Sequence, residues 1–245
     1  MKADPAVQRR LLGLAETDTE LSRIAHRRRN LPELAEITEC ERDLRAKRDA
    51  VVAAETTLGD LDRDVRRLET EIEHVRAREE RDRALMTGGG VSSKQLVDLQ
   101  HELDSLQRRK TTLEEELLEV MERREAVELD VAHAREALAA AEERLADAQR
   151  RRDQALADLE TAEARRNADR KNLLAELPGD LVALYERMRA KQGVGAALLR
   201  ARRCEACHLE LDRTALTALR EAAADDVVRC QECGVVLVRT AESGL

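Results

Sequence analysis

The clearest pattern in the chain is a ladder of apolar positions between residues 94 and 170. Successive positions are separated by three and four residues in strict alternation, which is the 3.5-residue repeat of a left-handed coiled coil. Seventeen of the twenty positions are apolar, and the exceptions are Lys110, Arg124 and Arg152. The pattern predicts a long helix with one narrow seam facing a partner helix. The positions are 96, 99, 103, 106, 110, 113, 117, 120, 124, 127, 131, 134, 138, 141, 145, 148, 152, 155, 159 and 162.

A second, less regular apolar repeat covers residues 33–86 and supplies the partner helix. The stretch LMTGGGVSSKQL lies between the two repeats, and its three glycines break the helix. Ser92 followed by Gln95 has the pattern of a capping box, which starts the next helix. Because so short a break turns the chain back along itself, the two repeats predict an antiparallel hairpin with its tip near residues 87–93.

The polar seam residue Arg124 suggests how the hairpin register is fixed. With the tip near residue 90, Arg124 falls opposite about residue 57, within reach of Glu55. A charge buried in a seam is costly unless it is paired. Two interpretations follow: an Arg124–Glu55 ion pair that fixes the register, or an arginine that extends along the seam to solvent.

Shorter helices flank the hairpin. An apolar repeat at Val7, Leu11, Leu14, Leu21 and Ile24 predicts an N-terminal helix, which we place against the base of the hairpin near residues 150–175. Pro32 suits the first turn of the helix that follows it.

A change of composition marks the end of the helical part. Pro178 is expected to start a short helix that Gly193 and Gly195 end. The predicted domains are a helical coiled-coil hairpin over residues 1–175, a connecting helix over 176–194 and a cysteine-containing module over 195–245.

Four of the five cysteines form two Cys-x-x-Cys pairs in the last module: Cys204, Cys207, Cys230 and Cys233. The pairs are separated by 22 residues, a spacing that can place four thiolates tetrahedrally around one Zn²⁺. Apolar runs at 195–199, 227–230 and 235–240 predict strands. Because the module is small and buries little apolar surface, metal binding must contribute to its folding. The fold class is therefore mostly α, a long antiparallel coiled-coil hairpin with a small C-terminal β zinc ribbon and one structural Zn²⁺.

The sequence gives less support to other roles for the cysteines. A thioredoxin-type motif needs a βαβ context, and a catalytic zinc needs an open coordination position. An iron–sulfur cluster is an alternative for four thiolates. His208 beside Cys207 could compete as a ligand, although an exposed side chain is the favoured interpretation. Cys40 lies alone on a predicted helix and is interpreted as an ordinary small residue, with oxidation as the alternative if it is exposed.

Composition, charge and motifs limit the classes of function that fit the chain. The chain has 38% charged residues, one tyrosine as its sole aromatic residue and a net charge of −8, which opposes general attraction to nucleic acid or anionic membranes. No apolar run is long enough to span a bilayer, and the first residues show no secretory signal. Walker A, GxSxG, HExxH and GxGxxG motifs are absent. We therefore expect a cytoplasmic protein that is not an enzyme and does not associate with membranes.

A locally basic stripe adjoins the first cysteine pair, and it can meet either phosphates or an acidic protein surface. Stacking of single-stranded bases needs aromatic platforms, and Tyr185 is the one available. We expect a non-enzymatic adaptor that recognises a protein partner through the zinc ribbon and this stripe, with a nucleic-acid-binding regulator as the alternative. Both a single chain and associated hairpins fit the pattern. The stripe consists of Arg187, Arg189, Lys191, Arg200, Arg202 and Arg203.

A long helical hairpin followed by CEACH and CQECG resembles a bacterial family of C4-type zinc-ribbon, coiled-coil proteins, whose members include a flagellar regulator and actinobacterial proteins. The resemblance covers nearly the whole chain, including GVGAALL before the first pair. It implies that the four paired cysteines bind zinc and that the protein is an adaptor or chaperone for other proteins, with nucleic acid linked to some members. The family pattern continues Cys-Gly-Arg, whereas Val235 follows Gly234 here, so no basic contact is implied there.

Overall fold

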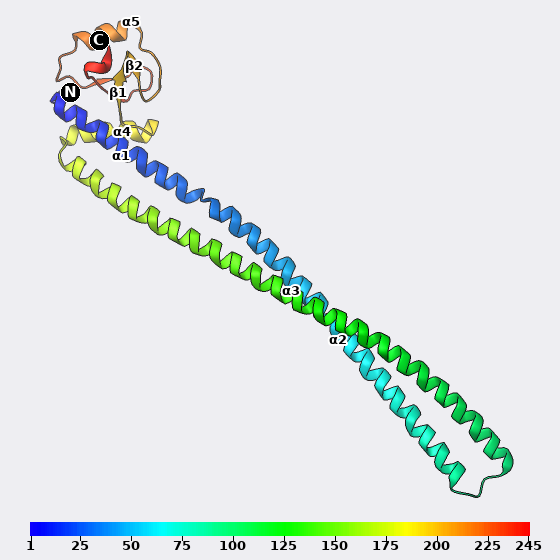
Figure 1. Cartoon of the computed structure of the whole chain (residues 1–245). Coiled ribbons are helices and arrows are strands. Elements are labelled where there is room, and N and C mark those ends of the chain that lie inside the picture. The colour runs from blue at the N-terminus through cyan, green and yellow to red at the C-terminus, as the bar shows by residue number, and fades with distance from the viewer. The chain divides into compact units, whose positions relative to one another are not determined.

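The computed structural model describes residues 1–245, and the chain is mostly helical, as predicted (Figure 1). It divides into two compact units, residues 1–34 with 151–245, and residues 35–150. Two long helices, α2 (Pro32–Thr87) and α3 (Ser93–Ala175), contribute to both units. None of the helices carries an apolar stretch of the length that a bilayer span requires.

In the unit formed by residues 35–150, α2 and α3 pack along the predicted seam. Leu68 and Ile72 of α2 form a buried cluster with Leu113 and Val120 of α3. Cross-helix ion pairs line the seam, and Arg76 Nη2 lies 2.8 Å from Glu114 Oε1. The buried residues of α3 all occupy predicted seam positions, which confirms the antiparallel coiled coil. They are Leu113, Val120, Val131, Ala141, Ala148 and Leu159.

The hairpin tip follows the predicted turn chemistry. The backbone N–H of Ser92 donates to Gln95 Oε1 at 2.8 Å, and the N–H of Gln95 donates to Ser92 Oγ at 3.4 Å, which is the expected capping box. Gly89 and Gly90 have φ of 77° and 91°, a conformation that glycine adopts without steric cost.

The predicted Arg124–Glu55 ion pair is wrong. The residue that pairs with Arg124 lies about two helical turns from Glu55 along α2. Arg124 Nε donates to Asp62 Oδ1 at 2.6 Å, and Glu55 Oε1 accepts from Arg135 Nη2 at 2.5 Å. The prediction paired residues symmetrically about the turn, but residues 93–98 of α3 are all exposed. Asp62 lies closer to the tip than a pairing symmetric about residue 90 gives, whereas Arg109 and Glu71 keep that symmetric pairing.

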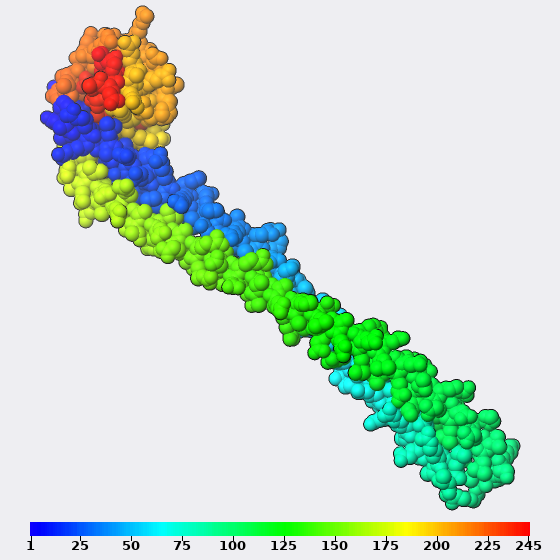
Figure 2. All heavy atoms as spheres, viewed as in Figure 1, coloured from blue at the N-terminus to red at the C-terminus, as the bar shows by residue number.

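The unit formed by residues 1–34 and 151–245 joins α1 (Pro5–Arg29), the end of α3, α4 (Gly179–Gln192) and the cysteine module. Leu11 and Leu14 of α1 are completely buried in a cluster with helical and sheet residues. In Figure 2 the blue N-terminal residues accordingly lie directly against the orange and red C-terminal ones. Helix α1 packs at the base of the hairpin, as expected, and also against the sheet, which the sequence pattern does not predict. Its partners in the cluster include Leu177, Leu181, Tyr185, Ala196 and Val236.

A buried carboxylate organises this helical core. Asp18 of α1 is 3% exposed and accepts hydrogen bonds from the Tyr185 hydroxyl and from Arg170 Nε, each at 2.7 Å. Arg189 Nε lies 3.1 Å from the same carboxylate. Burial, followed by the hydrogen bond to Asp18, raises the pKa of Tyr185. Asp18 thus ties α1 to both α3 and α4.

The sheet of the cysteine module has four short strands in the order β2-β1-β4-β3. Strands β1 (Ala196–Arg200) and β4 (Val236–Val238) are parallel, whereas β2 (Arg203–Cys204) and β3 (Val228–Arg229) pair antiparallel to their neighbours. The predicted apolar runs contain β3 and β4, and they contain all of β1 except Arg200. Val235 to Val238 are at most 1% exposed, so β4 is buried on both faces.

Helix α5 (Arg213–Glu221) covers one face of the sheet and is missing from the sequence prediction. Asp212 caps it by accepting the Ala215 N–H at 2.6 Å, and Ala215, Leu216 and Leu219 face the core. Arg239 holds the end of α5, since its guanidinium donates to the carbonyl oxygens of Leu219 and Ala222. The helix has 9 residues, too few for a repeat to stand out in the sequence.

Shortening a seam leucine should destabilise the hairpin in proportion to its burial. Leu113 is 1% exposed, whereas Leu118 on the same helix is 62% exposed. We expect Leu113→Ala to lower the free energy of unfolding by about 2–5 kcal/mol, because a cavity remains in the seam. Leu118→Ala should change it by less than about 0.5 kcal/mol. Urea denaturation followed by far-UV circular dichroism measures both, and equal effects would contradict the seam.

Adding a methyl group at Gly195 should displace the sheet from α4. A Cβ there would lie 2.5 Å from the Tyr185 ring and 2.7 Å from its carbonyl oxygen. We expect Gly195→Ala to destabilise the protein by roughly 1–3 kcal/mol. Gly59→Ala is the matched control, because no atom lies within 4 Å and alanine favours a helix interior by roughly 0.5–1 kcal/mol. Thermal denaturation should move in opposite directions for the two variants.

Candidate metal centre

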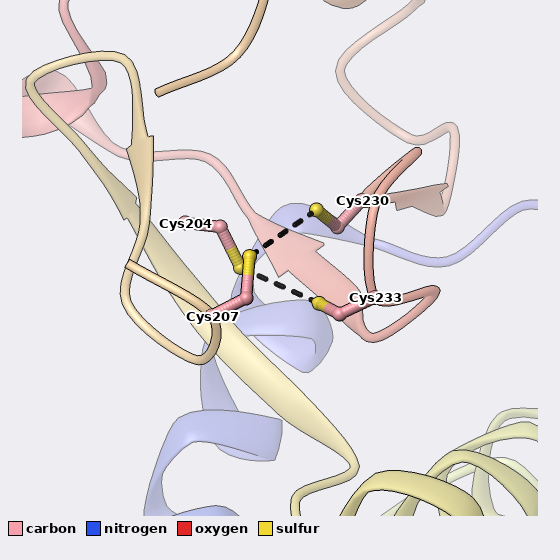
Figure 3. A group of neighbouring side chains, drawn as sticks. All are labelled: Cys204, Cys207, Cys230 and Cys233. Carbon is pink, nitrogen blue, oxygen red and sulfur yellow. Dashed lines mark hydrogen bonds between the residues drawn. The ribbon is translucent and has the colours of Figure 1, made fainter. Parts of the chain in front are cut away.

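The two cysteine pairs lie on separate loops that face each other (Figure 3). Cys204 ends β2 and Cys207 follows in the next turn, while Cys230 and Cys233 lie between β3 and β4. The four Sγ atoms lie within 4.8 Å of one another, with 3.8 Å between Cys204 and Cys233 and 3.9 Å between Cys207 and Cys230. A tetrahedron with Zn–S bonds of about 2.3 Å has S···S edges of about 3.8 Å. The spacing of the sulfurs therefore fits one Zn²⁺.

Each pair is held by the same kind of turn. The N–H of His208 donates to the Cys204 carbonyl oxygen at 2.7 Å, and the N–H of Gly234 donates to that of Cys230 at 2.9 Å. His208 and Gly234 each follow the second cysteine of a pair, and both have left-handed backbone, with φ of 60° and 78°. The His208 side chain is exposed and is not one of the clustered ligands. The favoured interpretation of His208 is confirmed.

The protein environment alone favours protonated thiols at two of the four positions. Burial raises the pKa of the Cys204 thiol and that of the Cys233 thiol. At Cys207 burial acts in the same direction, but hydrogen bonds from the Leu209 backbone and the neighbouring thiols outweigh it and lower the pKa. A divalent cation reverses this balance, because it binds thiolates and compensates their charge.

The ligand set determines the role of the metal. Four thiolates complete a tetrahedral zinc site and leave no position for a substrate or water. Cys204 and Cys230 are buried in the apolar cluster beneath the loops, and Cys207 and Cys233 pack against it at half burial. Zn²⁺ would therefore cross-link the two loops over the core of a module with only short strands.

The predicted basic stripe is not a continuous free surface. Arg189 is bound by Asp18 and Glu186, and Arg200 Nε lies 3.2 Å from Glu242 Oε2. Arg203 lies 4.0 Å from Glu210, and Arg202 Nε donates to the Gly244 carbonyl oxygen. Arg187 and Lys191 are exposed one turn apart on α4 and make no ion pair. Within the stripe, only Arg187, Lys191 and Arg202 have no carboxylate partner.

Two residues singled out in the sequence lie elsewhere. Tyr185 is completely buried beside Asp18, so its ring offers no stacking surface. Cys40 is half-buried on α2, outside the metal ligands. The sequence reasoning overlooked Asp18 itself. It occupies the repeat position between Leu14 and Leu21, and a lone acidic residue on an apolar stripe is the signal that could have found it.

Comparison with known proteins agrees with this architecture over both parts of the chain. The CT398-like coiled coil hairpin domain family matches residues 14–193, and the C4-type zinc ribbon domain family matches residues 203–237. The chain is 47% identical to Rv2229c of Mycobacterium tuberculosis over 239 residues, which is 98% of each chain. It is 36% identical to ML1638 of Mycobacterium leprae, covering 91% of this chain and 96% of that protein.

Two solved structures share the fold. A Mycobacterium smegmatis protein superposes with a TM-score of 0.85 at 43% identity and covers 98% of this chain and 100% of its own. CT398 from Chlamydia trachomatis gives a TM-score of 0.64 at 16% identity and covers 96% of this chain and 98% of its own. The zinc ribbon and its four-cysteine group are thus supported by the family match as well as by the geometry.

We expect one zinc ion per chain, and Cys204→Ser or Cys230→Ser should abolish its binding. Loss of the metal should unfold the ribbon but leave most of the far-UV helical signal, because residues 35–150 bury their own seam. Zinc should be released on acidification, since protons compete for the thiolates. Metal analysis and circular dichroism test these points. Cys40→Ser should retain full zinc, and two metals per chain or iron absorption would contradict the assignment.

Proposed function

Because the chain belongs to the CT398-like coiled-coil hairpin family with a C4-type zinc ribbon, we propose that it is a non-enzymatic, cytoplasmic adaptor with a protein partner. The ribbon, together with exposed basic residues next to it, would form the recognition surface. The hairpin would act as the scaffold from which that surface is presented.

A binding role is supported by the closed ligand set of the metal centre. Four thiolates around Zn²⁺ leave no coordination position for a reacting group, so the metal supports structure rather than catalysis. Zinc-bound cysteines are reduced thiolates. This fits the cytoplasm, because disulfide bonds are rare there. The ribbon then serves as a rigid platform whose surface side chains carry the recognition.

Burial of Tyr185 is the observation that favours a protein partner over nucleic acid. Single-stranded nucleic acid is commonly held by aromatic side chains, and Tyr185, the one aromatic residue of the chain, is completely buried. Two ribbon arginines, Arg200 and Arg203, already face carboxylates, and the net charge is −8. Phosphate contacts would therefore rest on few cations.

The exposed pair on α4 is the sharper candidate for a basic contact. Arg187 and Lys191 lie on one face of the helix because they are four residues apart. An acidic surface of a partner could pair with both cations without displacing an internal carboxylate. Arg200 and Arg203, by contrast, would have to give up Glu242 and Glu210.

The test is a nuclease-treated pulldown with the zinc-loaded full chain. We expect the double variant Arg187→Ala/Lys191→Ala to release the specific protein partner. The triple variant Arg200→Ala/Arg202→Ala/Arg203→Ala should release it as well if the ribbon contributes to the same surface. The control Arg81→Ala/Arg108→Ala removes two exposed hairpin arginines and should retain the partner.

Nucleic-acid binding is measured in parallel. Generic DNA or RNA should bind no more tightly than roughly 10⁻⁴–10⁻⁶ M at physiological salt. A specific nucleic acid bound at nanomolar affinity and dependent on these basic residues would reject the adaptor proposal. Its salt slope should then decrease by about two to three units in the triple variant.

A further inference from the structure

Strand β3 is an edge strand of the sheet, and half of its backbone polar groups face away from the sheet. Val228 and Arg229 pair with Leu237 and Val236 of β4, and the Cys230 N–H donates to the Val235 carbonyl oxygen at 2.9 Å. Peptide groups in an antiparallel pair alternate in direction. Those of Val228 and Cys230 therefore point to β4, and those of Arg229 point outward.

The chain's own N-terminus already pairs with the preceding part of this edge. The Val227 N–H donates to the Met1 carbonyl oxygen at 3.0 Å, and the Ala3 N–H donates to the Asp225 carbonyl oxygen at 2.7 Å. Lys2 lies opposite Asp226 in an antiparallel bridge. The edge therefore already pairs with one added segment. The pairing of the N-terminal residues ends before Arg229.

An apolar groove opens beside the unpaired part of the edge. It has a volume of about 170 Å³ and lies between α5 and β3. Pockets for drug-sized molecules measure roughly 300–1,000 Å³, so this groove suits one aliphatic side chain rather than a small-molecule ligand. It is lined by Leu211, Ala215, Ala218, Leu219 and Val228, with Arg229 and Gln231 at its border.

The charge at this edge indicates what else an added strand would carry. Arg229 is exposed and makes no ion pair. Side chains alternate along a strand, so the Arg229 side chain projects from the face opposite that of Val228, while the residue itself borders the groove. An added strand with an aliphatic residue toward α5 and a carboxylate on the opposite face would satisfy both features, because opposite charges on neighbouring strands attract.

We propose that the free edge of β3 binds an extended segment of a protein partner by strand addition. The segment alternates aliphatic and acidic residues, its backbone bonds to the peptide groups of Arg229, and one aliphatic side chain enters the groove beside α5. Backbone pairing supplies affinity and the groove supplies selectivity, as in other cases of strand addition. This inference rests on the proposed adaptor function and specifies the interface that the partner occupies.

The experiment selects random peptides displayed on phage against the zinc-loaded full chain and measures the affinity of the enriched sequence by fluorescence anisotropy. Arg229→Pro removes both the outward N–H and the guanidinium that faces the added strand, and it keeps an extended backbone, which proline tolerates on an edge. Ala218→Phe fills the groove from an exposed position on α5. Each substitution should weaken binding about tenfold or more. Thr217→Phe, on the neighbouring exposed residue, should change it less than about twofold.

Two further measurements keep the result interpretable. Zinc content must remain at one ion per chain in every variant, and Ala218→Phe provides the answer if Arg229→Pro fails to fold. Methylation of the peptide nitrogen that faces Arg229 should abolish binding, whereas methylation of the adjacent nitrogen should not.

The site would be overturned if no peptide is enriched, or if the enriched peptide tolerates both substitutions. It would also be overturned if Arg229→Pro instead abolished a concentration-dependent dimer of the chain, because the edge would then serve self-association. If both edge variants retain a partner in the nuclease-treated pulldown and Arg187→Ala/Lys191→Ala loses it, strand addition at β3 is rejected. That result would still support the adaptor function.

Discussion

The buried Asp18 carboxylate is the constraint around which residues 1–34 and 151–245 are arranged. A charge at 3% exposure is tolerated only with partners, and breaking such a pair costs about 3–5 kcal/mol. Its partners, Arg170, Tyr185 and Arg189, come from α3 and α4. Their donors are therefore committed to the interior. Arg189 and Tyr185, which look available for recognition in the sequence, hold the helices together instead.

Strand β4 connects this helical core to the metal centre. Val236 packs with Leu11 and Leu14 of α1, whereas Val235 and Leu237 face the cluster that contains Cys204 and Cys230. The ribbon is thus supported from two sides, by the metal cross-link of its loops and by the packing of α1. This also explains Val235, which stands where the family pattern has a basic residue: it is completely buried.

In the proposed adaptor, recognition would fall to the surface of the ribbon and to α4. The metal is enclosed by its ligands, and the aromatic ring is enclosed by the core. The exposed features include a pair of cations on α4, Arg187 and Lys191, and the open edge of β3 with its groove. Both features suit a polypeptide that carries acidic residues, the first through charge and the second through backbone pairing.

The helical hairpin, its tip and the four metal ligands could be predicted from the amino-acid sequence, because each depends on local spacing. A 3.5-residue repeat defines a seam wherever it occurs, the Ser92–Gln95 capping box is complete within four residues, and two Cys-x-x-Cys turns need only to meet. Long-range partners were decided by the tertiary structure. Arg124 pairs with Asp62 rather than with Glu55, and the packing of α1 gave Asp18 its partners. Such pairings depend on which surfaces meet and how far each side chain reaches, and no local pattern of residues encodes either.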